Sequence, residues 1–590
     1  MKKHSVQKGF AILSVSGIII KIISLLYIPL LLSIIGEKGN GFYQAAAQIF
    51  VFAYVLTNSG TLNAITKMTS EYVARGEHQD GVASGRLMAN IDAQKAFKVS
   101  RLALAAIGGI ITLLLIILSQ PIANAVRFPE ISLSIIVIAP SAFLTAIVSS
   151  YRGYYQGMNN FRPRAVSQVL EQSVNLVASI GLALLGVAIF GFGRDGILMA
   201  VAGANAGTTV AALASLVYLV RFSKKHEKEI AVQTTCLPGE EPVRKAFSIS
   251  RKTWDATPES VAHSEKEFRK KALATFFRYS IPITMAAGLQ YAGSIVDMWN
   301  TKSRLLVAGF SPDVATEMFG YLAKYQQLIY VPLIIIIGLA STILPNLSGF
   351  HAIDDTSKFK SSLSYAYRWC FIIAIPSTIL MAVLSSQIFS TIHLGKGSEL
   401  LMIGSVVTVL MAVSQIQSSV LQGLSKMYLL AGFLLAGIAA KILVNYVLIA
   451  IPFINVNGAI IGSIVCYMIP VYLNNRYIRA QLRKKFRITG EKPPKIMPFV
   501  YKPFSSAMIM GFVVAIVYAI FYALTSAIFG KTGSGGYFAV LIPFIISVIA
   551  GGVTFLGAMV AFKGFKKIDL EMIPHRLKKF IPKRVLDGLK

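Results

Sequence analysis

Long apolar runs, many of about 20 residues, follow one another along the whole chain and are separated by short polar breaks. A run of roughly 20 apolar residues is long enough to cross the hydrocarbon core of a bilayer as a helix. Only helices and closed barrels satisfy their backbone hydrogen bonds there, and these runs are too long for barrel strands. The sequence therefore predicts an all-α polytopic membrane protein with about fourteen transmembrane helices.

The first expected span runs well past the length of a signal-peptide core and has no small-residue cleavage pattern, so we expect it to be retained. The fourteen expected spans are 9–34, 42–68, 99–119, 131–156, 165–190, 197–222, 273–305, 317–347, 363–391, 399–423, 428–451, 457–475, 503–527 and 538–562.

Lys and Arg residues are distributed unevenly between alternate loops. Of the 57, 41 lie at the two chain ends and in the loops after even-numbered spans. The loops after odd-numbered spans contain only Lys38, Arg127, Arg194, Lys396 and Lys531. Because cytoplasmic loops carry such an excess, we expect a cell-membrane protein with both termini in the cytoplasm. The net charge of +31 then reflects sidedness and contact with anionic lipids, and it requires no nucleic-acid partner.

One large hydrophilic insert, 223–272, has mixed charges and few large apolar residues. Such a segment buries little core, so we expect a cytoplasmic linker loop, with a regulatory site there as the alternative. The predicted domains are the N-lobe 1–222 with spans 1–6, the linker 223–272, the C-lobe 273–480 with spans 7–12, residues 481–562 with a basic loop and spans 13–14, and the basic cytoplasmic tail 563–590.

The two predicted lobes contain a weak internal repeat in a common order. The matched positions are Tyr43 with Tyr321, Gly60 with Gly338, Gln156-Gly157 with Gln422-Gly423, and Asn175 with Asn445. Many transporters consist of two repeats with a substrate site between them. We therefore expect two six-helix lobes plus two extra C-terminal helices. Chance similarity among apolar helices is the alternative.

Several ionisable residues lie inside the expected spans. They are Lys21, Arg152, Glu171, Asp297, Lys324 and Lys441. A charge at the bilayer centre costs about 2.5–3.5 kcal/mol on insertion scales, so such residues normally face a wet cavity or a partner. Lys21 and Lys441 lie deepest, and we expect them to face a cavity, with a buried ion pair as the alternative. The excess of bases over acids favours an anionic, phosphate-bearing substrate.

The remaining intramembrane charges have simpler explanations as well. Arg152 and Lys324 lie nearer span ends, where their side chains can also reach the headgroups. Glu171 is placed to pair with Arg152. Asp297 is placed to pair with Lys302, Arg304 or Lys21, or to bind a coupling cation.

Motifs for several enzyme classes are missing. The sequence has no Gly-x4-Gly-Lys-Ser/Thr, no His-Glu-x-x-His and no Gly-x-Ser-x-Gly pattern. Its three cysteines, Cys236, Cys370 and Cys466, lie far apart, which disfavours a disulfide framework or a zinc site. We therefore expect no enzyme activity, no catalytic residue, no metal site and no cofactor, apart from coupling to Na⁺ or H⁺.

A family resemblance rests on particular stretches of this sequence. The most specific is Tyr151-Arg152-Gly153-Tyr154-Tyr155-Gln156-Gly157-Met158-Asn159-Asn160, followed by Pro163, Ala165, Ser167-Gln168 and Glu171-Gln172; others are Gly41-Phe42-Tyr43, Ile65-Thr66-Lys67, Ile295-Val296-Asp297 and Lys441-Ile442-Leu443. With these stretches the chain resembles the multidrug/oligosaccharidyl-lipid/polysaccharide flippase superfamily over nearly its whole length. It is similar to the polysaccharide-biosynthesis branch that includes stage V sporulation protein B and the MurJ-type lipid II flippases.

The resemblance implies two lobes around a cationic cavity, with spans 13 and 14 beside a groove for a polyprenyl tail. It implies alternating access that moves a lipid-linked sugar pyrophosphate, a cell-wall or polysaccharide precursor, from the inner to the outer leaflet. The expected substrate-binding residues are Lys21, Lys67, Arg152, Lys324 and Lys441, and the expected coupling or gating residues are Asp297 and Glu171. Family members usually have Arg where this chain has Lys21, so the charge is kept and the forked geometry is lost.

Two other functions stay open at this point. A drug/cation antiporter of the same superfamily requires acids rather than bases to dominate the cavity. A membrane-embedded glycan-assembly protein is the third hypothesis. The expected partners are a lipid-linked oligosaccharide, membrane lipids and the cell-wall synthesis machinery.

Overall fold

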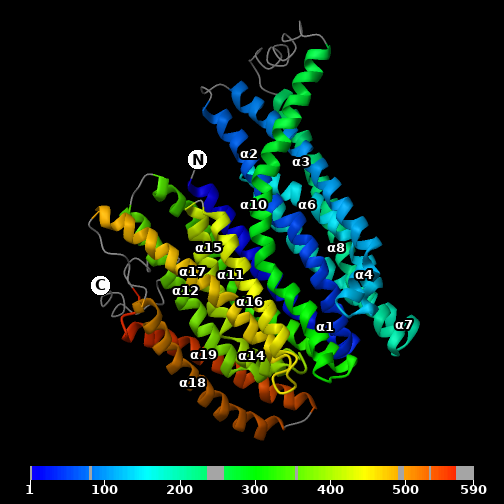
Figure 1. The fold of residues 1–590 in the computed structure, drawn as a ribbon, viewed down its shortest axis with the longest axis vertical. Helices are drawn as coiled ribbons and strands as arrows, with labels where there is room; N and C mark the ends of the chain where they lie inside the picture. The colour runs from blue at the N-terminus through cyan, green and yellow to red at the C-terminus, as the bar shows by residue number, and fades with distance from the viewer. Residues whose placement is uncertain are drawn as a thin grey trace. The chain divides into compact units, whose positions relative to one another are not determined.

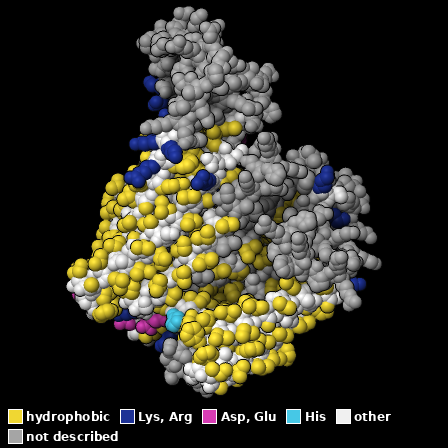
Figure 2. All heavy atoms as spheres, turned by 180° about the vertical axis from the view of Figure 1, so that it is seen from behind, with side chains coloured by type: hydrophobic (Ala, Val, Ile, Leu, Met, Phe, Trp, Pro, Cys, Tyr) yellow, Lys and Arg dark blue, Asp and Glu magenta, His cyan; other side chains and the backbone are white. Residues whose placement is uncertain are grey.

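The computed structural model describes residues 3–78, 83–235, 258–352, 356–424, 426–489, 497–530 and 533–565, and in these residues its regular secondary structure is helical (Figure 1). Eleven of the described helices are long and apolar enough to cross a membrane, or twelve if a bent pair, Ser398–Gly404 with Val407–Gly423, is one span. The chain is thus a multi-pass membrane protein. On the face in Figure 2, hydrophobic side chains cover most of the described surface, and Lys and Arg gather mainly along its upper margin.

The fourteen expected spans exceed the count of twelve at two places in the chain. The segment Val15–Val73 counts once, although it covers two expected spans. Helix α1 (Lys3–Tyr54) breaks within this segment at Gly36, whose φ of 68° and ψ of −178° are not helical. Helix α10 (Pro258–Val307) contains the expected span 273–305 and is not among the eleven, because small and polar residues interrupt its apolar run. The number of fourteen membrane spans stays a prediction.

The chain divides into two compact units. Unit 1 comprises Met1–Ser303 and Pro312–Glu317, and unit 2 comprises Arg304–Ser311 and Met318–Lys590. Unit 1 therefore includes most of α10, which holds the expected first span of the C-lobe. Residues 236–257 of the expected linker and 566–590 of the tail lie outside the described residues. Both ends of that linker are helical, because α8 continues to Thr235 and α10 begins at Pro258.

Unit 1 is built around α2, which follows α1 after one π-helical segment. Its elements are α1, η1 (Val55–Ser59), α2 (Gly60–His78), α3 (Ala83–Ile117), α4 (Ser119–Ala125), η2 (Pro129–Ile131), α5 (Ser132–Ile138), α6 (Pro140–Gly157), α7 (Arg162–Phe190), α8 (Arg194–Thr235) and α10. Helix α2 packs against α3 and α6. Ile65 and Met68 of α2 join a buried cluster with Ala272 and Phe276 of α10, so three helices, α3, α6 and α10, meet around α2.

Unit 2 contains the remaining helices. They are α11 (Pro312–Ala352, from Met318 onward), α12 (Thr356–Val383), α13 (Ser385–Thr391), α14 (Ser398–Gly404), α15 (Val407–Gly423), α16 (Met427–Leu448), α17 (Asn457–Thr489), α18 (Met497–Phe529) and α19 (Gly533–Ala561). Helices α18 and α19 pack side by side, and α18 also contacts α12 (Figure 1). The last two expected spans are thus attached to the rest of the unit through α12, which contacts α18, and through α13, which contacts α19.

Candidate functional site

Two glycines of α6 allow it to approach α2 very closely. A Cβ atom on Gly157 would lie 2.5 Å from Cβ of Thr69, and one on Gly153 would lie 2.8 Å from the carbonyl oxygen of Leu62. The hydroxyl of Thr66 also donates to the carbonyl of Gly153 at 3.2 Å. Small residues four positions apart are a common means of close helix packing in membranes. This contact fixes the part of α2 that carries Lys67.

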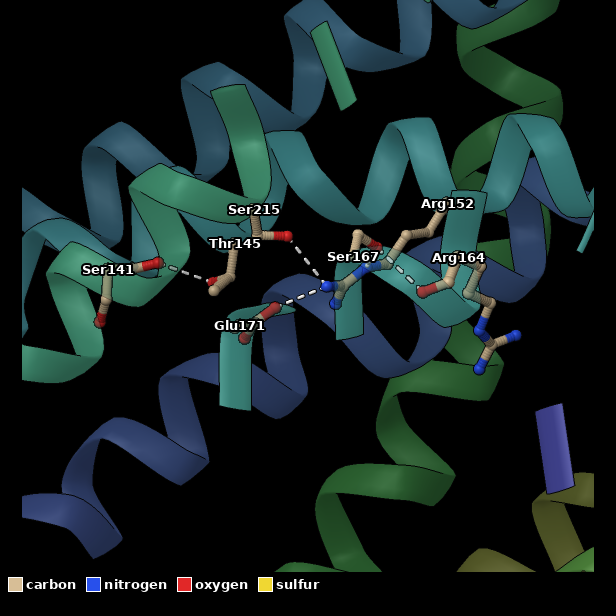
Figure 3. Close-up of polar contacts among 7 residues, drawn as sticks. All are labelled: Ser141, Thr145, Arg152, Arg164, Ser167, Glu171 and Ser215. Atoms are coloured by element: carbon tan, nitrogen blue, oxygen red, sulfur yellow. Dashed lines mark hydrogen bonds and ion pairs between the residues drawn. The ribbon is translucent and has the colours of Figure 1, made fainter. Parts of the chain in front are cut away.

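The residue before Gly153, Arg152, is the centre of a buried polar network that joins α6, α7 and α8 (Figure 3). Its Nη2 lies 2.5 Å from Oε2 of Glu171 and donates to Oγ of Ser215 at 3.0 Å. Its Nε donates to Oγ of Ser167 at 2.8 Å. The Arg152 side chain is 1% exposed and that of Glu171 is 15% exposed. The expected pairing of Glu171 with Arg152 is confirmed.

This network holds three helices together through one guanidinium group. Charge-assisted hydrogen bonds are roughly twice as strong as neutral ones, and Arg can direct several of them at once. Figure 3 shows the neighbouring Arg164 guanidinium directed away from Glu171, and Arg164 instead donates to the amide oxygen of Gln156. In this conformation the geometry favours a structural or gating role for Arg152. A direct contact between Arg152 and cargo stays a prediction.

Lys67 differs from Arg152 because its side chain is 56% exposed. Its ammonium lies 4.1 Å from the centre of the Tyr279 ring on α10 and 4.0 Å from Oε1 of Glu71, one turn further along α2. The Tyr279 hydroxyl donates to the Glu71 carboxylate, at 3.0 Å to Oε1 and 3.2 Å to Oε2. Sequence reasoning identified Lys67 and missed both of its neighbours.

The two expected cations of unit 2 are buried. Lys441 on α16 is 3% exposed and donates to Oγ of Ser463 on α17 at 3.0 Å. Lys324 on α11 donates to the carbonyl of Leu394 at 2.6 Å, and its ammonium lies 4.9 Å from the centre of the Tyr321 ring. Both lysines are therefore engaged with protein groups in this conformation, and their roles in binding substrate stay predictions.

Asp297 is buried in α10. Of its three expected partners, Lys302 lies 4.1 Å from the centre of the Phe128 ring, and Arg304 donates from Nε to the carbonyl of Tyr446 at 3.0 Å. The third, Lys21, lies in α1, but its side chain is outside the described part of the structure. The pairing of Asp297 and its coupling role therefore stay predictions.

The described site residues thus form two groups and the separate, buried Asp297 in unit 1, and two separate positions, Lys324 and Lys441, in unit 2. Arg152 and Glu171 are brought together in a closed pair, and Lys67 lies beside Glu71 and Tyr279 near the middle of α2. In the described residues, no group of three His, Cys, Asp or Glu side chains could hold a metal ion.

Comparison with known proteins identifies the family. A family model described as polysaccharide biosynthesis protein matches residues 6–351, which is more than half of the chain. The chain belongs to this family. The matched region covers nearly all of unit 1 as well as the first part of unit 2, so it includes the Arg152 network and the Lys67 group.

Two curated relatives of this chain come from Bacillus subtilis (strain 168). The membrane protein YabM is 24% identical over 593 residues, which cover 100% of this chain and 99% of YabM. Stage V sporulation protein B is 27% identical over 405 residues, which cover 68% of each protein. A solved structure of the lipid II flippase MurJ, in an inward closed conformation, has a TM-score of 0.59 at 12% identity and covers 93% of this chain and 98% of MurJ. The family member described here therefore has a MurJ-like fold.

Proposed function

We propose that the protein is a flippase that moves a lipid-linked saccharide pyrophosphate from the inner to the outer leaflet by alternating access. The proposal is supported by membership of the polysaccharide biosynthesis family and by the fold shared with a lipid II flippase over 93% of the chain. The observation that carries it is the exposed Lys67 ammonium on α2, a helix that packs against the α6 helix of the buried Arg152–Glu171 pair. No step of this function requires an enzyme reaction.

The physical need for a protein is clear. A pyrophosphate and its sugars lose their hydration when they enter hydrocarbon, and ions and unpaired polar groups are costly there. Lysine side chains can replace part of that hydration as point charges, and Arg can grip phosphate in a forked geometry. Lys21 and Lys67 are the cations that we assign to the pyrophosphate, with Arg152, Lys324 and Lys441 reaching it in other conformations of the cycle.

We further propose fourteen crossings with both termini in the cytoplasm. The break at Gly36 supports two crossings within Val15–Val73, because the non-helical backbone there divides the segment into two helices. Figure 1 places the N-terminus and α2 toward the same end of the picture, as two opposite crossings require. Helix α10 is the remaining addition, since its 50 residues are more than enough to span a bilayer. Lys67 then lies at the cytoplasmic end of the expected span 42–68, and this end of unit 1 is called the inner end below.

In this proposal the acids respond to the coupling ion. Asp297 is buried, and Glu171 is the acid of a closed pair. Protonation of Glu171, or binding of Na⁺ at Asp297, would change the charge balance of the helices that must move. We assign gating to these two residues and cargo binding to the lysines, with no other cofactor.

The test is transport in liposomes of defined composition. Purified protein should speed the movement of a fluorescent lipid II analogue between leaflets, and the Lys21→Ala and Lys67→Gln variants should be slow at equal protein levels. Equal rates with and without protein would contradict the proposal. Loss of lipid-linked substrate to longer glycans in detergent would favour a glycan-assembly enzyme instead.

A drug/cation antiporter is the second candidate, and the burial of Asp297 favours it. A deletion strain that became sensitive to cationic dyes, without a defect in cell-wall or spore precursors, would select this function over the first.

A further inference from the structure

Three side chains at the inner end of unit 1 form a group that the proposed function does not yet use in full. Lys67 and Glu71 lie one turn apart on α2, and Tyr279 reaches them from α10. The side chains of Lys67 and Glu71 are 56% and 37% exposed, so solvent or a ligand can reach both. The packing of Phe276 against Met68 and Ile65 fixes the two helices beside this group.

The distances indicate that Glu71 is shared unequally between its two neighbours. The Tyr279 hydroxyl lies 3.0 and 3.2 Å from the two carboxylate oxygens, whereas the Lys67 ammonium lies 4.0 Å from the nearer one. A distance of 4.0 Å is the outer limit of an ion pair, and an exposed pair of this kind is weak. The Lys67 ammonium also lies 4.1 Å from the centre of the Tyr279 ring. The attraction between the cation and the ring draws the ammonium away from the carboxylate.

We propose that Glu71 is a replaceable counter-ion of Lys67 and that Tyr279 is a positioning residue that holds Glu71 away from the ammonium. An incoming pyrophosphate takes the place of Glu71 at Lys67, and Glu71 returns when the cargo leaves. The inference rests on the proposed function, because it takes a pyrophosphate as the ligand of Lys67. It adds the reason why a binding lysine has an acid beside it: the acid competes with cargo and keeps release fast.

The proposal predicts opposite effects for two neighbouring substitutions. Glu71→Gln removes the competitor, so pyrophosphate should bind more tightly and leave more slowly. Tyr279→Phe keeps the ring over Lys67 but removes the hydroxyl, so Glu71 is released to pair more closely with the lysine and pyrophosphate should bind more weakly. Because Tyr279 acts through Glu71, the double variant should behave like Glu71→Gln alone.

The experiment measures binding of two probes, inorganic pyrophosphate and farnesyl pyrophosphate, to the full-length protein in nanodiscs. Exposed ion pairs contribute modestly, so we expect Kd to fall about threefold in Glu71→Gln and to rise about threefold in Tyr279→Phe. In the liposome assay, Glu71→Gln should lower both KM and kcat, and Tyr279→Phe should raise KM with little change in kcat. Both shifts should shrink as salt concentration rises.

Helix α10, which carries Tyr279, also offers a matched control. Glu267 and Lys271 of α10 form an exposed pair of the same spacing at 2.8 Å, and neither belongs to the proposed binding site. Glu267→Gln therefore removes the same charge from the same end of the unit. It should leave both Kd values within error of those of the native protein.

Several outcomes would overturn the inference. If both single variants weakened binding and lowered the unfolding temperature together, the group would be a structural contact. If the double variant showed the sum of the two single effects, Tyr279 would not act through Glu71. Failure of the native protein to bind either probe would remove the proposed function, and this inference with it. Normal native binding with tighter binding by Tyr279→Phe would remove only the inference.

Discussion

The Arg152–Glu171 pair and the Lys67–Glu71 pair both lie in unit 1, yet they differ in almost every physical respect. The first is 2.5 Å long and 1% and 15% exposed, and two serines complete its hydrogen bonds. The second is 4.0 Å long and 56% and 37% exposed. A buried pair costs much to break because its partner is left charged in a dry site, whereas an exposed pair exchanges partners easily. The comparison separates a charge that holds helices from a charge that is available to a ligand.

The largest effect is expected from a substitution that breaks the buried pair. Arg152→Met keeps the length of the side chain but leaves the Glu171 carboxylate without its cation, so we expect unfolding in detergent to become easier by about 3–5 kcal/mol. Adding Glu171→Leu should recover part of that loss. An unchanged unfolding midpoint in the single variant would show that the pair does not hold α6, α7 and α8 together.

A smaller effect is expected where α6 meets α2, the helix that carries the exposed pair. Gly157→Ala places a methyl group 2.5 Å from Cβ of Thr69, so the helices must separate, at a cost of about 1–3 kcal/mol. Gly181→Ala on α7 is the control, because nothing lies within 4 Å of its Cβ position. Equal unfolding midpoints for the two variants would contradict the close packing.

The exposed pair should contribute still less to stability. Lys67→Met is expected to change the free energy of unfolding by about 0–1 kcal/mol while transport of lipid-linked substrate falls sharply. Lys271→Met, at the same end of unit 1, should leave both unchanged. A loss of stability similar to that of Arg152→Met would erase the distinction between the two pairs.

The smallest expected effect concerns a third pair, Lys38 with the exposed Asp313, which lies outside the expected spans. The hydrogen bond from Lys38, at 2.6 Å, lowers the pKa of Asp313. A carboxyl whose pKa is lower in the folded protein contributes stability above its unfolded pKa, and this contribution is lost as pH falls through the folded value. The difference in unfolding temperature between the native protein and Asp313→Asn should therefore be slight near pH 7 and should vanish in acid. A difference that grew in acid would contradict this sign.

The architecture and one ion pair could be predicted from the sequence, because their signals are local or strong. Apolar runs define membrane helices whatever their neighbours are, and opposite charges in adjacent spans have few other partners, as Arg152 and Glu171 illustrate. The family resemblance, which is now established, also rested on the stretch around Arg152. The spacing of Gly153 and Gly157 was the available signal for the close contact between α6 and α2.

Other features depend on which neighbouring groups each side of a helix packs against. The depth of Lys441 in the membrane can be predicted from the sequence. A helix that is apolar on all sides, however, does not reveal which neighbour one lysine faces. The structure shows that Lys441 donates a hydrogen bond to Ser463. Tyr279 and Glu71 lie 208 residues apart and near span ends, where a tyrosine and a glutamate attract no notice. Only the packing of α10 against α2 brings them together.

The π-helical segment Val55–Ser59 leads directly into α2, with no residue between them. A wide turn of this kind contains one residue more than an α-helical turn, and here Ser149 of α6 donates to the carbonyl of Thr57 at 3.2 Å. Because the extra residue is taken up within this one turn, deleting one residue of the segment would restore α-helical winding and leave the direction of α2 side chains unchanged. Deleting one residue of α2 between Gly60 and Lys67 would instead rotate Lys67 by about 100° away from Tyr279, so the wide turn is where a lost residue would not change the direction of the cation.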